Sequence, residues 1–149
     1  ILGNRTYNAT GTGTYEFFVD LTTNYLKLVE VQTPSILITS TTAVTPGVWQ
    51  HVAISRDSSS NMRIFINGVL SSSVVNSTFN FSSINPIKIG INYDAGLLSF
   101  IGYLSNVRFV VGTAVYTSNF TPSTTPLTGQ LRKRSKRLFQ LNTSAETLS

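Results

Sequence analysis

The chain has 149 residues, of which 41% are hydrophobic, 11% aromatic and 11% charged, with a net charge of +5 and no cysteine. This length suits one hydrophobic core, and the lack of cysteine excludes a disulfide framework, a thiolate nucleophile and a Cys-ligated metal. The charged fraction is far below the roughly 25% of typical soluble domains, so Ser, Thr and Asn must supply solubility, as in many secreted and virion proteins.

Strand signals recur along the whole chain, whereas helical periodicity is nearly absent. Alternating β-branched and aromatic residues between turn signals predict strands over residues 14–20, 25–31, 36–39, 49–56, 62–66, 69–74, 87–91, 100–111 and 138–141. Asn67-Gly68 predicts a type I′ turn, because both positions of that turn need a positive φ. About nine short strands without an internal repeat predict an antiparallel sandwich or jelly roll, not a propeller.

Three segments carry a family pattern. They read P-G-V-W-Q-H-V-A-I-S-R (46–56), M-R-I-F-I-N-G-V-L (62–70) and G-Y-L-S-N-V-R-F-V-V-G-T-A-V-Y-T-S-N-F-T-P (102–122). Together they resemble the laminin-G-like, concanavalin A-like jelly-roll domains, and the third is especially similar to versions in tail, fibre and other virion proteins of marine phages. The resemblance covers residues 15–127 and extends weakly to 141. It implies an all-β jelly-roll sandwich over residues 1–130, a basic loop over 131–137, a closing strand of the same sandwich over 138–143, and a tail over 144–149.

The start of the chain departs from this pattern. Such domains usually open with two further strands before the one that matches Tyr15 to Asp20, whereas this chain opens at I-L-G-N-R-T-Y. The resemblance therefore implies that a first strand is lacking here, and unpaired edges promote association. We expect another chain, or a further portion of a precursor, to supply that strand. The start at Ile1, without methionine, likewise predicts a fragment or a processed product.

Catalytic residues do not form a recognisable set. His51 is the only histidine and no nucleophile motif accompanies it, while its position two residues after Trp49 predicts a packing role and the Trp49 indole is expected to seal one end of the core. Glu16 and Asp20 share a strand face but lie about 13 Å apart, too far for the roughly 5–9 Å that separates the carboxyls of a glycosidase. The sequence therefore predicts a protein that is not an enzyme.

Calcium is the one cofactor that the residues leave open. Related laminin-G-like domains often bind one ion at the rim of the sandwich, so the resemblance implies that loop oxygen ligands matter here. Asp94, with Asn92 beside it, and Asp57 are the metal-ligating candidates.

Sugar binding needs an aromatic platform and side chains that bind hydroxyl groups. Residues of this character in predicted loops are Asn92, Tyr93, Asp94, Tyr116 and Asn119. The alternative is that the tyrosines cap the core.

The positive charge comes from one run, which contains Arg132, Lys133, Arg134, Lys136 and Arg137. The run is a solvated loop, a patch for an anionic partner, or a processing site, since its last four residues fit the R-x-K-R pattern of furin-like proteases. It lacks the interleaved aromatic residues that bind single-stranded nucleic acid, and no apolar run is long enough to span a bilayer.

Two functions remain open at this point. The first is a non-catalytic virion structural or adhesion module, such as a fibre, decoration or capsid-associated domain. Its expected partners are proteins of a larger assembly, copies of itself or a cell-surface glycan, without nucleic acid. The second is a carbohydrate-binding domain of a secreted or cell-surface protein. Both predict a location in the virion or outside the cell.

Overall fold

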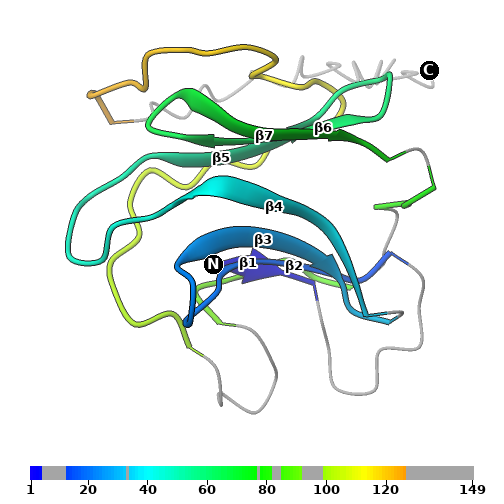
Figure 1. The fold of residues 1–149 in the computed structure, drawn as a ribbon, viewed down its shortest axis with the longest axis horizontal. Helices are drawn as coiled ribbons and strands as arrows, with labels where there is room; N and C mark the ends of the chain where they lie inside the picture. Colours follow the sequence, from blue (N-terminus) through cyan, green and yellow to red (C-terminus); the bar gives the residue numbers. More distant parts are fainter. Residues whose placement is uncertain (5–12, 33, 77, 82–84, 92–98, 127–149) are drawn as a thin grey trace, which may run out of the picture.

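The computed structural model describes residues 1–4, 13–32, 34–76, 78–81, 85–91 and 99–126. These residues form two antiparallel β-sheets that stack face to face (Figure 1). Sheet A has five strands in the order β4-β3-β2-β1-β8, and sheet B has three in the order β5-β6-β7. The strands are β1 (Leu2–Gly3), β2 (Tyr15–Val19), β3 (Tyr25–Glu30), β4 (Ser35–Ala43), β5 (Val52–Arg56), β6 (Asn61–Ile66), β7 (Val69–Val75) and β8 (Lys88–Ile89). The predicted all-β antiparallel sandwich is confirmed.

The hairpin between β6 and β7 forms as its turn sequence predicts. Asn67 and Gly68 both have positive φ, 51° and 79°, which is the requirement of a type I′ turn. The turn aligns Ile66 with Val69, and this register places alternate side chains of β6 on opposite faces of sheet B.

The core lies between the two sheets and is built from the inward face of each strand. Leu26 and Leu28 of β3, and Met62 and Ile64 of β6, are at most 1% exposed. Burying one such side chain contributes roughly 1.5–3 kcal/mol. The other buried members of this core are Tyr15, Phe17, Leu37, Ile38, Ile66 and Phe79.

One flank of the sandwich is closed where β4 meets β7. The Ser71 side chain on β7 accepts hydrogen bonds from the backbone N–H groups of Thr41 and Thr42 on β4, both at 3.1 Å. These contacts join the edge of sheet A to the edge of sheet B, so neither β4 nor β7 is a fully free edge at this point.

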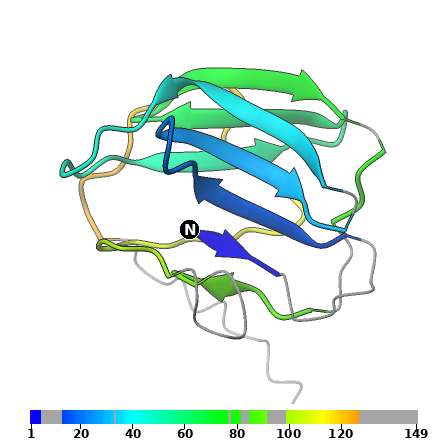
Figure 2. The ribbon, with the colours of Figure 1, turned by 60° about the horizontal axis from the view of Figure 1, so that its bottom comes forward.

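The prediction of a long strand over residues 100–111 is wrong. An isolated bridge joins Ile91 to Ser99, and the Phe100 N–H donates to the Gly90 carbonyl at 2.8 Å, but residues 101–111 belong to neither sheet. Figure 2 shows this segment, yellow-green to yellow, crossing the flank between the strands of sheet B and β8. Its alternating sequence favours an extended conformation, but a strand also needs a neighbour with which to form hydrogen bonds, and no strand in the described part of the chain lies against it.

The remaining predicted strands differ in extent only, or lie elsewhere. The strand predicted over 87–91 shortens to β8, and the one predicted over 36–39 lengthens to β4. The predicted closing strand, 138–143, the basic loop and the tail lie outside the described residues.

Candidate functional site

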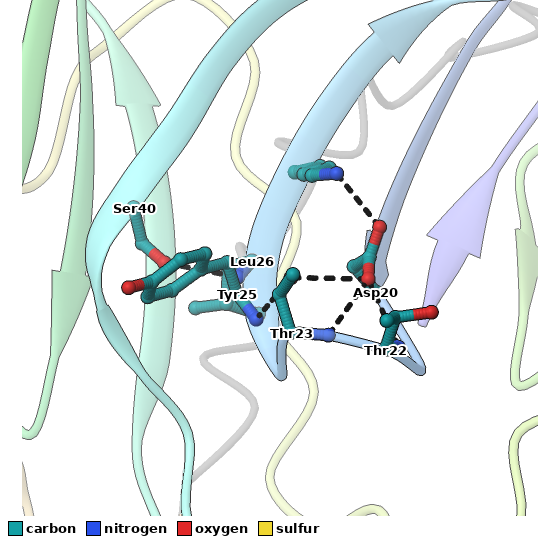
Figure 3. A network of polar contacts seen from close by, with 7 residues as sticks. Asp20, Thr22, Thr23, Tyr25, Leu26 and Ser40 are labelled. Carbon is teal, nitrogen blue, oxygen red and sulfur yellow. Dashed lines mark hydrogen bonds and ion pairs between the residues drawn. The ribbon is translucent and has the colours of Figure 1, made fainter.

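Asp20 directly follows β2 and closes the turn into β3 (Figure 3). Its Oδ1 accepts hydrogen bonds from the backbone N–H groups of Thr22 (3.0 Å) and Thr23 (2.9 Å), and its Oδ2 lies 2.7 Å from Lys27 Nζ. The Lys27 ammonium, followed by the donors of the turn, holds the pKa of Asp20 well below its usual value. This carboxylate is engaged in holding the β2–β3 hairpin.

Asp57 plays the same part in the turn between β5 and β6. Its Oδ1 accepts hydrogen bonds from the backbone N–H groups of Ser59 and Asn61, both at 3.0 Å. Its Oδ2 lies 2.8 Å from Arg63 Nη1. The Arg63 guanidinium is the main cause that lowers the pKa of Asp57 to about 2.

These contacts bear on the two predicted calcium ligands. Both oxygens of Asp57 already accept hydrogen bonds from protein donors, so a cation at this carboxylate would have to displace Arg63. No group of three or more His, Cys, Asp or Glu side chains that could hold a metal ion occurs in the described ranges. Asp94, the other predicted ligand, and Asn92 lie outside the described residues, so the predicted site at the rim stays a prediction.

Tyr116 and Asn119, two of the predicted glycan-binding residues, lie on the outer face of sheet B. The Tyr116 ring stacks on Phe120 with centroids 3.6 Å apart and an interplanar angle of 6°. The Asn119 Oδ1 accepts a hydrogen bond from the Leu70 N–H of β7 at 2.8 Å. Tyr116 also packs against Phe65 of β6, so both residues hold the chain after 115 against the sheet, and their predicted role in glycan binding stays a prediction. Tyr93, with Asn92 and Asp94, lies outside the described residues.

A second, smaller apolar cluster therefore covers sheet B from outside. Phe65 points away from the main core, yet it is 0% exposed, because the rings of Tyr116 and Phe120 lie over it at 6.3 Å and 5.4 Å between centroids. His51 joins the same cluster at 5.4 Å from Phe120. Phe65 and Ile66 are consecutive residues of β6, so their side chains lie on opposite faces and one serves each side of the sheet.

His51 has the packing role predicted for it. Its ring meets the Tyr116 and Phe120 rings edge to face, and burial lowers the pKa of the imidazole. Its Nδ1 is buried without a hydrogen-bond partner. No nucleophile or carboxylate contact to this ring is present in the part of the chain that the structure describes.

Trp49 does not seal the core, contrary to the prediction. Its side chain is 69% exposed, and among the described residues its ring contacts that of Tyr103, with ring centroids 6.5 Å apart. Tyr103 in turn is 85% exposed. Both rings lie at the flank that residues 101–111 cross, and sequence reasoning missed this surface because alternation of apolar residues normally signals burial.

Two further predictions concern the basic run and a membrane-spanning segment. The predicted basic patch, from Arg132 to Arg137, lies outside the described residues. The described part of the chain contains no helix long and apolar enough to cross a bilayer.

Comparison with known family models identifies the superfamily of this sandwich. The family model Laminin_G_3, described as the concanavalin A-like lectin/glucanases superfamily, matches residues 3–128. The chain belongs to this superfamily. The two antiparallel sheets are accordingly those of a concanavalin A-like jelly roll. Comparisons with curated proteins and with solved structures gave no match.

Membership of the concanavalin A-like superfamily narrows the ligand class without choosing between binding and catalysis. Its description names lectins, which bind carbohydrate, and glucanases, which cleave it. Both names point to carbohydrate as the ligand class. In this member, two of the described carboxylates, Asp20 and Asp57, accept hydrogen bonds from turn donors and from a cation, an arrangement suited to holding hairpins.

Proposed function

We propose that this concanavalin A-like domain is a non-catalytic structural or adhesion module of a virion, such as a fibre, decoration or capsid-associated domain. One observation carries the proposal: the domain exposes large apolar side chains along residues 101–111 and at Trp49. Exposed apolar surface of this extent marks an interaction site. A module that functions inside a larger assembly can have such a surface, because its neighbours cover it.

Further support comes from the sequence and from the carboxylates. The stretch from Gly112 to Pro122 resembles virion proteins of marine phages, and the surface relies on hydroxyl groups more than on charge. Asp20 and Asp57 are both bound by cationic side chains, whereas a glycosidase needs a pair of carboxyl groups that flank the scissile bond and are free to act as acid and as base or nucleophile.

Localisation tests this proposal directly. Immunogold electron microscopy with antibodies against the domain is expected to label intact particles produced by the genome that encodes it. Label confined to secreted, particle-free material would overturn the virion role. An assay against a panel of β-glucans should show no hydrolysis, and measurable turnover would overturn the non-catalytic role.

The second candidate is a carbohydrate-binding domain of a secreted or cell-surface protein. It is favoured by the family description, which names lectins. A glycan array probed with the folded domain, with calcium and again with EDTA, separates the two. Saturable binding that is lost in EDTA would make Asp94 and Asp57 the first residues to replace.

A further inference from the structure

The two sheets of the sandwich have different numbers of strands, five in sheet A and three in sheet B. The difference lies on one flank. Sheet A ends in β1 and β8, whereas sheet B ends in β5. The opposite flank is closed by the contacts of Ser71 with Thr41 and Thr42. On the open flank, β5 has β6 as its one strand neighbour among the described residues.

The backbone of β5 has an unused hydrogen-bonding edge. The β5–β6 ladder includes the bond from Asn67 N–H to the His51 carbonyl and the bond from Asp57 N–H to the Asn61 carbonyl. Residues of an antiparallel strand alternate between their two neighbours, so Val52, Ile54 and Arg56 direct their N–H and C=O groups to the other side. Within the described ranges no group pairs with them there, and every residue of β5 is only half-buried.

Residues 101–111 border the same flank and are rich in exposed apolar side chains. Ile101 is 98% exposed and Val111 83%. Two contacts near its start fix where the segment begins: the Tyr103 ring lies against Trp49, three residues before β5, and Leu104 lies near Gly90, one residue after β8. The exposed apolar residues of the segment are Ile101, Tyr103, Leu104, Val107, Phe109, Val110 and Val111.

A single cation lies in the middle of this apolar segment. Arg108 is exposed, between Val107 and Phe109, and among the described residues it makes no ion pair. A partner that covers Val107 and Phe109 would partly remove Arg108 from water, which is favourable only when a carboxylate meets it. The partner therefore needs a carboxylate that lies opposite Arg108.

From these observations we infer that the open flank binds an extended strand of a partner polypeptide. The strand adds to sheet B along β5, taking the outward backbone groups of Val52, Ile54 and Arg56, and it covers the apolar side chains of residues 101–111. Main-chain hydrogen bonds then supply affinity and alternate side chains supply specificity. The partner strand has at least the five residues of β5, large apolar side chains at alternate positions, and an acidic residue facing Arg108.

Within the described residues, the segment that comes nearest to this pattern is not free. That segment is β2, Tyr15–Val19, which has an internal acid, and it is already paired with β1 on one side and β3 on the other. Releasing it would expose Tyr15 and Phe17 of the core. The inference deepens the proposed function by naming the kind of partner, but particle localisation and strand binding are measured separately and can fail separately.

The single tryptophan provides the test, because Trp49 lies on the open flank. The full chain is titrated with a synthetic peptide of alternating Ile and Thr with a central Glu. We expect a saturable blue shift of Trp49 emission and reduced acrylamide quenching. A matched peptide with Lys in place of Glu is expected to bind about five- to tenfold more weakly.

Charge exchange identifies the contact. Arg108→Glu is expected to reverse the preference, so that the Lys peptide binds better than the Glu peptide, and the exposed position of Arg108 leaves folding intact. As a control, Leu21→Glu changes a 91% exposed residue in the β2–β3 turn and should leave both affinities unchanged. Absence of peptide binding by folded protein would overturn the inference. So would a concentration-dependent dimer that shields Trp49 without peptide, because the occupant would then be a second copy of the chain.

Discussion

Two segments of this molecule have the same sequence character and different structures. Residues 61–75 alternate apolar and polar side chains and form the β6–β7 hairpin, whereas residues 101–111 alternate in the same way and join no sheet. The hairpin finds its partner across a two-residue turn. Residues 101–111 depend on a neighbour far away in sequence or in another chain. Alternation therefore predicts the extended conformation, while strand formation is decided by the availability of a neighbour.

The largest expected effect is on the free energy of unfolding, when one isoleucine of each segment is replaced by alanine. Ile64 of β6 is fully buried, and Ile101 is 98% exposed. Ile64→Ala is expected to lower the free energy of unfolding by about 2–5 kcal/mol, whereas Ile101→Ala should change it by less than about 0.5 kcal/mol. Urea denaturation followed by far-UV circular dichroism measures both. Equal losses would mean that residues 101–111 are packed as part of the core.

Two glycines, Gly68 in the β6–β7 turn and Gly47 outside the sheets, allow the packing at this turn to be measured. Gly68 and Gly47 both have positive φ, 79° and 77°, but a Cβ at Gly68 would lie 1.9 Å from the Phe120 carbonyl oxygen, whereas a Cβ at Gly47 would meet nothing within 4 Å. Gly47→Ala should cost about 1 kcal/mol, from backbone strain alone. Gly68→Ala should cost about 1–3 kcal/mol more, because Phe120 must move. Thermal unfolding of the two variants gives the difference, and a Gly68 variant no less stable than the Gly47 variant would contradict this packing.

The β5–β6 turn gives a pH dependence. Arg63 and the turn donors lower the pKa of Asp57 to about 2 from 3.8, so Asp57 contributes stability that is present above about pH 4 and is lost as the pH falls from 4 to 2. Asp57→Asn should flatten this part of the stability profile. Unfolding midpoints from pH 5 to pH 2 provide the measurement, and Asp20→Asn, which changes the other turn carboxylate, serves as its comparison.

The smallest effect concerns His51, one residue before β5. Burial lowers its pKa below 6.5, so the folded state favours the neutral ring, and stability is expected to decrease slightly as the pH falls below 6.5. The chain has one histidine, so its ring resonances are unambiguous in an NMR titration. A measured pKa above 6.5 would contradict the packing of this ring against Tyr116 and Phe120.

Local rules explain which parts of the fold were predictable from sequence. The Asn67-Gly68 turn depends on residues close together in the chain, and its prediction was confirmed. The positions of Trp49 and of residues 101–111 depend on which strand lies beside them, which local periodicity cannot encode.

The site was less predictable for the same reason. Tyr116 and Asn119 have the side chains expected of a sugar site, but their contacts are with Phe120 and Leu70. The cluster around Phe65 could have been suspected from its sequence, because an aromatic residue on the solvent side of a predicted strand needs cover. Asn92, Tyr93 and Asp94 remain predictions for the rim of the sandwich.

The cover over Phe65 has a consequence for synthesis. Tyr116 reaches Ser55 across 61 residues of sequence, and Asn119 reaches Leu70 across 49. A ribosome adds about 5–20 residues per second. The residues that cover the outer face of sheet B are therefore synthesised on the order of 2–10 seconds after the sheet itself. During that interval Phe65 is an exposed aromatic on a nascent sheet, which is the kind of surface that chaperones bind.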